Sequence, residues 1–309
     1  MKKVLRIIII LVSILVVGFL SLVAIYFIQK KPLYYTSYEN ANAYSVGSFS
    51  YDAQTIDEVN VTWISGTVQF KQASGNVLNV KEEDGNLAEK QRMRWQLDGR
   101  TLRIQYWASN YGTDKDLNKT LTVEIPDGIN LHVEVKKGAI MMGSHHLKHL
   151  NAQITSTGDV EAEALVIEQE CILNDTAGNL HIRSVTAQEA RVSSKLGETR
   201  IDNLDIQGQL EMTSVWGTLK LGTVKAEEVK IEKYEDVQMG LDSCKAVDIK
   251  MTKGNINLTL KRGLGATVDF STGSGKLNGK IVRDSDQTVI GDGSCKIKVD
   301  VSMGNLTVK

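Results

Sequence analysis

The chain has 309 residues, of which 42% are hydrophobic and 24% charged, as in globular proteins that bury a sizeable core. Its formal net charge of -1 excludes a global field that would recruit nucleic acid. There are 26 glycines but only 2 prolines, which is typical of a chain that turns often and keeps its backbone hydrogen-bond donors. Only 6% of the residues are aromatic, so we expect a core of Val, Ile and Leu.

The first segment, residues 1–30, contains an uncharged apolar run over residues 7–28 that is long enough to cross a bilayer as a helix. Lys2, Lys3 and Arg6 precede the run, and the positive-inside rule then places the N-terminus in the cytoplasm. We therefore expect a single-pass anchor in the cell membrane that contacts lipid through residues 7–28, with the rest of the chain outside the cytoplasm. A cleaved signal peptide is the alternative, although no small-residue cleavage site follows the run.

Residues 31–50 are polar and rich in Tyr, Ser and Asn, which favours a linker between membrane and domain. Tyr34, Tyr35, Tyr38 and Tyr44 lie in it. We interpret this segment as a tether, with contact to a partner or to the lipid interface as the alternative.

Residues 51–126 are predicted to form a β-rich cap, which solenoids need to prevent edge-to-edge association. The dipeptide Asp98-Gly99 between two apolar runs predicts a hairpin. The expected strands are Val59–Ile64, Thr67–Gln72, Val77–Glu82, Met93–Leu97, Thr101–Trp107 and Thr120–Ile125.

Residues 127–309 contain an internal repeat of roughly 20 residues, in which a glycine begins a short apolar-alternating run. The interval between Gly217 and Gly254 fits two repeats if Glu235 or Asp236 takes a glycine slot. Apolar residues alternate on both sides of each glycine, which predicts two short strands per repeat with one face inward. The glycines are Gly138, Gly158, Gly178, Gly197, Gly217, Gly254, Gly275 and Gly304.

This repeat lacks the i, i+3, i+4 spacing of helices, and one repeat cannot bury its apolar face alone. The sequence therefore predicts an all-β fold, a parallel β-solenoid of about nine turns. Leu219 and Leu221 are expected to point inward, with Ile201 in the adjacent turn. The enlarged turn before Gly304 is expected to fold over the end of the rod with Val282–Gln287 as a loop, and end-to-end association of two rods is the alternative.

Several segments resemble the bacterial putative-adhesin domain of unknown function over about residues 51–309. They are WQLDGRTLRIQYW, LTVEIPDGINLHVEVKKGAI, TGDVEAE, AGNLHIR and KGNINLTL. The strand end at Ile125-Pro126, followed by Gly-Asp/Asn-Val/Ile repeats, is the more specific part. The first repeat departs from the family's SGDV pattern, with Gly138 followed by Ala139 and Ile140. The resemblance implies a single-stranded β-solenoid in envelope or secreted proteins and supplies no catalytic residues.

The three cysteines, Cys171, Cys244 and Cys295, lie far apart, and no CxxC motif occurs. We therefore interpret them as small core residues rather than as a disulfide framework. Cys171 falls in an inward slot of the repeat.

A histidine cluster is formed by His145, His146 and His149. Imidazoles can hold a metal ion, but no Cys, Asp or Glu neighbours them in the sequence. We interpret the cluster as a solvated corner of the solenoid.

Two further motifs are interpreted as ordinary structural elements rather than as ligand-binding sites. Glu82, Glu83 and Asp84 lack the alternating ligand spacing of a calcium loop, so a hairpin turn is expected there. Residues 272–279, TGSGKLNG, lack the GxxxxGK[ST] spacing of a phosphate loop and precede a strand rather than a helix.

Charged residues of both signs align on neighbouring repeats, a pattern typical of a solvated face. They are Arg183, Lys195, Arg200, Lys220, Glu161, Glu163, Glu198 and Glu211.

No pair of groups can be assigned acid and base roles by spacing, so the sequence predicts no catalytic, metal-binding or cofactor-binding residue and no enzyme activity. The expected function is a surface protein, adhesin-like or an envelope scaffold, with an unknown protein or glycan partner and no nucleic acid. The alternatives are a carbohydrate-active β-helix enzyme on cell-wall or host glycans and an envelope-stress regulatory component.

Overall fold

The computed structural model describes residues 43–83, 86–107 and 117–309. The expected anchor and its lipid contact at residues 7–28 lie outside these ranges, as do Tyr34, Tyr35 and Tyr38. Within the described ranges, no helix is long and apolar enough to cross a membrane.

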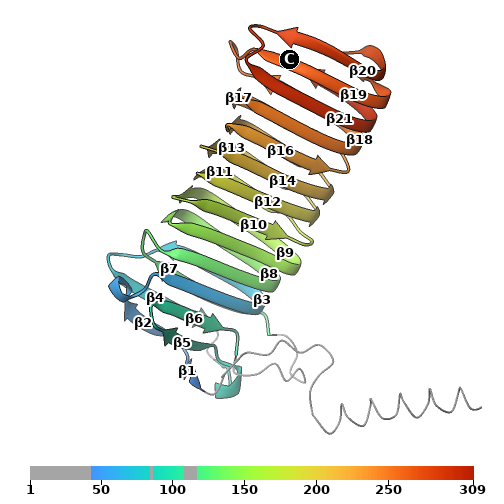
Figure 1. The fold of residues 1–309 in the computed structure, drawn as a ribbon. Helices are drawn as coiled ribbons and strands as arrows, with labels where there is room; N and C mark the ends of the chain where they lie inside the picture. Colours follow the sequence, from blue (N-terminus) through green and yellow to red (C-terminus); the bar gives the residue numbers. More distant parts are fainter. Residues whose placement is uncertain (1–42, 84–85, 108–116) are drawn as a thin grey trace, which may run out of the picture.

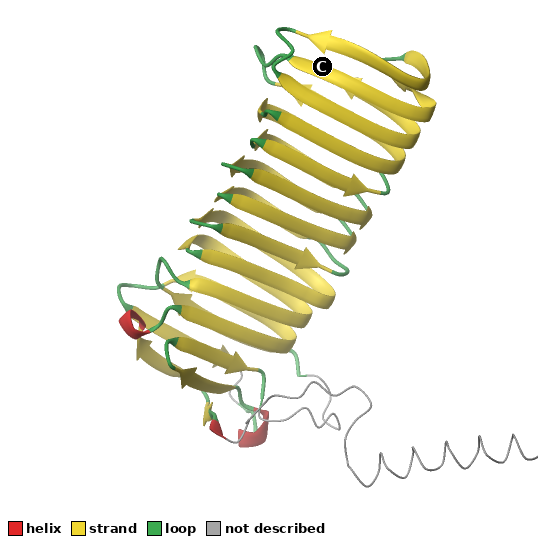
Figure 2. Cartoon of the chain, in the orientation of Figure 1, coloured by secondary structure: helices red, strands yellow, loops and turns green. Residues whose placement is uncertain are grey.

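The described chain forms an elongated rod of stacked strands (Figures 1 and 2), which confirms the expected all-β fold with parallel, solenoid-like architecture. Short 3-10 helices occur at η2 (Ala53–Thr55) and η3 (Glu89–Gln91). The strands are β1 (Ser45–Val46), β2 (Phe49–Asp52), β3 (Glu58–Gln72), β4 (Val77–Glu83), β5 (Arg94–Asp98), β6 (Thr101–Gln105), β7 (Lys119–Ile125), β8 (Asn130–Leu147), β9 (His149–Ile167), β10 (Glu170–Asp175), β11 (Leu180–Ala187), β12 (Glu189–Leu196), β13 (Thr199–Ile206), β14 (Gln209–Trp216), β15 (Leu219–Lys225), β16 (Glu228–Lys233), β17 (Val237–Ser243), β18 (Ala246–Leu260), β19 (Ala266–Leu277), β20 (Lys280–Ile290) and β21 (Cys295–Val308).

The middle of the rod stacks in chain order. β8 pairs in parallel with β9, which pairs with β10 and β11. The following turns, β12 with β13, β14 with β15 and β16 with β17, add one after another in parallel register until β18. Inter-strand hydrogen bonds therefore run along the rod, and each turn rests on its neighbours.

The repeated glycines stack on one another at a corner of the rod. Gly197 has φ 119°, and a Cβ atom there would lie 1.7 Å from the carbonyl oxygen of Gly178. The same clash would arise at Gly138, where the Cβ position lies 1.9 Å from the oxygen of Gly66. Only glycine tolerates both the positive φ and this approach, which explains the spacing seen in the sequence.

The Asp or Asn that follows a corner glycine hydrogen-bonds to the adjacent turn. The Asn179 backbone N–H donates to Asp159 Oδ1 at 2.8 Å. The Asn255 N–H donates likewise to Asp236 Oδ1 at 2.6 Å. The register with Gly217 and Gly254 places Glu235 in the substitute slot, one of the two residues that the sequence predicted for it, and Asp236 follows it as Asp159 follows Gly158. The side-chain oxygens of Asp159 and Asp236 satisfy backbone donors that the corner would leave unpaired.

The core consists mainly of apolar side chains that alternate along each strand. Leu219 and Leu221 are buried as predicted, and Leu221 stacks between Ile201 and Met239 of the adjacent turns. Cys171 is also buried, as expected from its inward slot.

The N-terminal end differs from the prediction because β3 is a turn of the rod rather than part of a separate cap. Its register places Gly66 beside Gly138 of β8, and Val68 beside Ile140. On its other side β3 pairs in parallel with β6 and β7. The antiparallel strands β4 and β5, followed by β2 and β1, then close this end.

The hairpin β5–β6 is confirmed, but its turn lies one residue later than predicted. Asp98 pairs with Thr101, so Gly99 and Arg100 form the turn. Gly99 has φ 61°, a conformation that favours glycine.

The C-terminal end also departs from chain order. Strand β21 lies between β18 and β19 and pairs in parallel with both (Figure 1). Strand β20 pairs antiparallel with β19 and forms the outer edge. Val282–Gln287 is therefore part of an edge strand and not a loop, and the enlarged turn covers the end of the rod.

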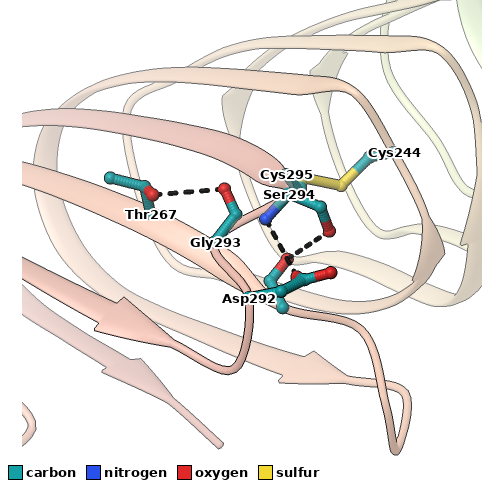
Figure 3. Close-up of a disulfide and its surroundings, with 7 residues drawn as sticks. Cys244, Thr267, Asp292, Gly293, Ser294 and Cys295 are labelled. Carbon is teal, nitrogen blue, oxygen red and sulfur yellow. Dashed lines mark hydrogen bonds between the residues drawn. A yellow bond between two sulfur atoms is a disulfide. The ribbon is translucent and has the colours of Figure 1, made fainter.

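The prediction that the cysteines form no disulfide is wrong for two of them. Cys244 and Cys295 are joined in a disulfide with a Cα–Cα distance of 5.6 Å (Figure 3). The preceding loop presents Cys295: Ser294 N–H donates to Asp292 Oδ1 at 3.1 Å, and the Thr267 hydroxyl donates to Gly293 O at 3.2 Å. The Ser294 N–H holds the pKa of Asp292 below its usual value.

Candidate functional site

Two open grooves follow the outer surface of the rod. The first, called the central groove, has a volume of about 690 Å³ and spans β3, β8, β9, β11 and β13. Gly143 and Ala162 in its lining contribute little side-chain bulk. Its lining is Gln69, Phe70, Met141, Met142, Gly143, Glu161, Ala162, Glu163, His181, Ile182, Arg183, Arg200 and Asp202.

Most charges of the central groove pair within the rod. Arg183 Nη1 lies 3.3 Å from Glu163 Oε2, and Arg200 Nε donates to Asp202 Oδ1 at 2.9 Å. The Arg183 and Glu163 side chains are 74% and 64% exposed. Such exposed pairs contribute little stability, so this surface fits the predicted solvated face of mixed charge.

The second groove, called the C-terminal groove, has a volume of about 910 Å³ and crosses β16, β18, β21, β19 and β20 in stacking order. These strands run from the last regular turns to the edge of the rod (Figure 1). Its lining is Glu232, Lys233, Lys250, Met251, Thr252, Ser271, Thr272, Gly273, Asp284, Asp300, Val301 and Ser302.

Several charged groups of the C-terminal groove are not engaged within the rod. In the part of the chain that the structure describes, Glu232, Lys250 and Asp284 make no side-chain hydrogen bond or ion pair. Asp284 has φ 86°, an uncommon conformation for a residue with a side chain, and lies at the irregular part of the β19–β20 pairing. This irregularity of the ladder places the Asp284 side chain at the groove.

An exposed aromatic pair lies near the C-terminal groove. The rings of Trp216 and Tyr234 are 4.3 Å apart at 48°, and Trp216 is 45% exposed. Val215 in the same strand and Leu196, which pairs with Trp216 from the preceding turn, are also exposed. Sequence reasoning did not single out Trp216, although its position just before Gly217 places it in an outward slot.

Inside the rod, four consecutive turns carry polar side chains in one inward column, where aliphatic residues were expected. Asp175 pairs in register with Ser194, Ser194 with Ser214, and Ser214 with Lys233. All four are buried. Lys233 Nζ donates to Ser214 Oγ at 3.1 Å and to Gly217 O at 2.6 Å.

Burial shifts both ends of this column toward their neutral forms. It raises the pKa of Asp175 to about 6. It also lowers the pKa of Lys233, against the opposing effect of the nearby carboxylates of Glu235 and Asp236. The register places Asp175 three strand spacings from Lys233, roughly 14 Å, so this acid and base do not pair directly.

Comparison with protein families identifies the chain. The model of the Toastrack DUF4097 family matches residues 56–309, which include all strands from β3 onward. The chain belongs to the Toastrack DUF4097 family. The resemblance to a putative-adhesin domain of unknown function is thereby confirmed.

Solved structures similar to this Toastrack chain share little sequence with it. A putative adhesin from Bacteroides fragilis is 12% identical, with a TM-score of 0.38, over 86% of this chain and 97% of that one. A putative adhesin from Parabacteroides distasonis is 11% identical, with a TM-score of 0.38, over 86% and 97%. A putative cell adhesion protein from Clostridium sporogenes is 11% identical, with a TM-score of 0.24, over 86% and 99%. No curated protein matches the sequence.

The three histidines of the Toastrack chain do not share one solvated corner, and that interpretation is wrong for His145. His145 is buried, and burial lowers its pKa. His146 is exposed and lies 3.4 Å from Glu168. His149 begins the next strand, β9.

Glu82, the last residue of the expected strand Val77–Glu82, lies in β4, and its side chain is buried. Its Oε1 accepts from Lys119 Nζ at 2.6 Å, and both side chains are at most 4% exposed. The ammonium lies 4.8 Å from the Trp63 ring and 4.0 Å from the Tyr106 ring. Glu83 ends β4, and Asp84 lies outside the described residues.

The segment that superficially resembled a phosphate loop, residues 272–279, forms the end of β19 and the β19–β20 turn. Leu277 pairs with Lys280, and Asn278 and Gly279 adopt positive φ values of 47° and 85°. A strand follows, as predicted, so the helix N-terminus that a phosphate loop requires does not occur at this position.

Proposed function

We propose that this protein is a non-catalytic, adhesin-like binding protein of the cell envelope, anchored by residues 7–28 with the rod outside the cytoplasm. The C-terminal groove is the observation that carries the proposal. It combines a rigid floor of hydrogen-bonded strands with charged groups that have no partner in the described part of the rod. Binding residues on a rigid scaffold need little reorganisation when a ligand arrives.

The disulfide supports an extracytoplasmic location. Disulfides persist in oxidising compartments and are rare in the cytosol. Cys244 and Cys295 join two segments of the rod, and the basic residues before residue 7 favour the same orientation.

Protease treatment of intact cells tests the topology. The region after Lys31 should be digested from outside while the N-terminal segment is protected. Complete protection of the rod would contradict the proposed orientation.

Attachment assays test the binding role. Cells that display the protein should attach to a coated surface, to host matrix or to other cells more strongly than cells that lack it. Equal attachment in all three settings would contradict an adhesin-like role and favour the envelope-stress alternative.

A glycan-cleaving enzyme is the second candidate, because Glu232, Asp284 and Asp300 line one groove. Paired carboxylates perform glycoside hydrolysis when they flank the scissile bond. Release of reducing ends from cell-wall glycan by the purified protein, lost on Glu232→Gln, would establish this activity in place of the non-catalytic role.

A further inference from the structure

The aromatic pair and the C-terminal groove form one continuous surface. Tyr234 follows Lys233, which lies in the groove, and the Lys253 N–H donates to Tyr234 O at 3.0 Å. This hydrogen bond sets Tyr234 beside Thr252, a residue of the groove wall. The ring of Trp216 packs against Tyr234 from the preceding turn.

The wall continues from Tyr234 along the rod without a break. Thr252 lies beside Ser302, because the residues on either side of each pair in register between β18 and β21. Ser302 lies beside Gly273 of β19 in the same way, and Asp284 of β20 pairs with Thr272. The groove therefore crosses five strands from Glu232 to Asp284, about 19 Å at the usual strand spacing.

Hydrogen-bond donors and acceptors both line this groove, and its carboxylates outnumber its free ammonium groups. Hydroxyl groups can donate or accept, ammonium groups donate, and carboxylates accept. The groups at outward positions are the hydroxyls of Thr252, Ser271 and Ser302, the ammonium group of Lys250, and the carboxylates of Glu232, Asp284 and Asp300, whereas Lys233 and Thr272 are buried.

We propose that the C-terminal groove binds a neutral oligosaccharide chain, with one sugar ring against Trp216 and Tyr234 and the following hydroxyls along the strands toward Asp284. This inference names the ligand class of the proposed binding function and rests on it. A sugar presents a ring face for aromatic contact and many hydroxyls that match mixed donors and acceptors.

Other ligand classes fit the groove less well. A polyanion needs a surplus of Arg and Lys, and here the carboxylates outnumber the lysines. An amphipathic helix needs an apolar groove, whereas the exposed walls of this one are polar.

Binding of the purified full-length protein to an array of immobilised neutral and anionic oligosaccharides tests the proposal, followed by calorimetry with the soluble form of the strongest neutral ligand. Trp216→Ala should weaken the affinity about fivefold, because aromatic contacts of this kind are worth on the order of 1 kcal/mol. Trp216→Tyr should retain most of the affinity, and Asp284→Asn should reduce it.

Two control variants separate the groove from the rest of the surface. Arg183→Ala alters the central groove, and Val166→Ala removes an exposed apolar side chain elsewhere on the rod. Both should bind the neutral ligand as the wild type does. Thermal unfolding of each variant verifies that the fold is kept.

Three results would overturn the inference: binding to anionic glycans alone, no glycan binding, or wild-type affinity in a folded Trp216→Ala variant. Attachment assays distinguish this failure from failure of the proposed function. Wild-type attachment by cells carrying Trp216→Ala would reject the groove and keep the adhesin-like role. Glycan binding without any cell attachment would keep the groove and reject that role.

Discussion

The two ends of the rod meet the same physical requirement with different chemistry. Each end stops a parallel stack with antiparallel strands, β4 and β5 at one end and β20 at the other. The N-terminal end is held by the buried pair of Lys119 and Glu82 among aromatic rings. The C-terminal end is held by the Cys244–Cys295 disulfide. Both ends of the solenoid therefore use antiparallel strands, while the contacts that stabilise those strands differ between the two ends.

The largest effect is expected from removing the disulfide. The Cys244→Ser, Cys295→Ser double variant should lose roughly 4 kcal/mol in free energy of unfolding, because the bond closes a loop of 51 residues in the unfolded chain. Urea titration measures the loss. Hydrogen exchange should quicken in β18, β19 and β21 and stay unchanged in β4 and β7; faster exchange at both ends would contradict independent ends.

A somewhat smaller loss is expected from Glu82→Ala, which leaves the Lys119 ammonium buried without its carboxylate. The cost should be about 3 to 4 kcal/mol, with faster exchange confined to the N-terminal end. Glu83→Ala, next to it but exposed, is the matched control and should change little. If both variants lose the same stability, the buried pair does not hold this end.

The middle of the rod gives a third region for comparison, through the buried Asp175. Because burial raises its pKa to about 6, protonation favours the folded state. Its stabilising contribution is full below the unfolded pKa near 4 and is lost as pH rises through about 6, by roughly 2 to 3 kcal/mol.

Urea titrations from pH 4 to pH 7 should therefore show wild type losing stability relative to Asp175→Asn. The difference in stability between Asp175→Val and Asp175→Asn should not change with pH, because neither variant has a titrating group at this position. Asp175→Val should be the more stable of the two at pH 7, because the preceding turn has the apolar Ile154 in this column. Parallel pH profiles for wild type and Asp175→Asn would exclude a titrating carboxyl at this site.

The smallest effect on stability is expected from Lys280→Ala at the outer strand β20. Its exposed pair with Asp286 should leave the unfolding midpoint unchanged. Light scattering should nevertheless show more self-association, because Lys280 is a charged residue beside the exposed Ile281 on an edge strand. Lys195→Ala in the middle of the rod is the control, and equal association of the two variants would count against a protective role of Lys280.

Sequence reasoning succeeded where a feature depends on short-range pattern. The glycine corners, the slot of Glu235 and the inward positions of Leu219 and Leu221 follow from alternation and spacing. The hairpin before Thr101 follows from its turn residues. The glycine corners and the inward positions recur along the rod, so each repeat supports the interpretation of the next.

Sequence reasoning failed where a strand or a cysteine pairs with a partner that is distant in the sequence. The pattern around Gly66 matches the repeat, yet β3 was assigned to the cap; its register partner Gly138 lies 72 residues further along the chain. The disulfide was missed for the same reason. Aligning the similar repeats of β18 and β21 places Lys245 beside Cys295, one residue from Cys244, and this alignment was the available signal.

The grooves could be anticipated only in part. Outward charges were predicted as a mixed face, and the central groove agrees with that. The C-terminal groove depends on β21 lying between β18 and β19, an order that no local pattern encodes. Its combination of Glu232 with Asp284 therefore became visible only in three dimensions.

The insertion of β21 has a consequence for biogenesis. Translation produces β19 and β20 before β21, yet β19 reaches its final neighbour only when β21 has taken its place next to β18. The rod therefore cannot grow by simple addition of successive turns at this end. Cys244 must also remain a thiol until Cys295 is synthesised. The disulfide can therefore form only after the first residue of β21 is available.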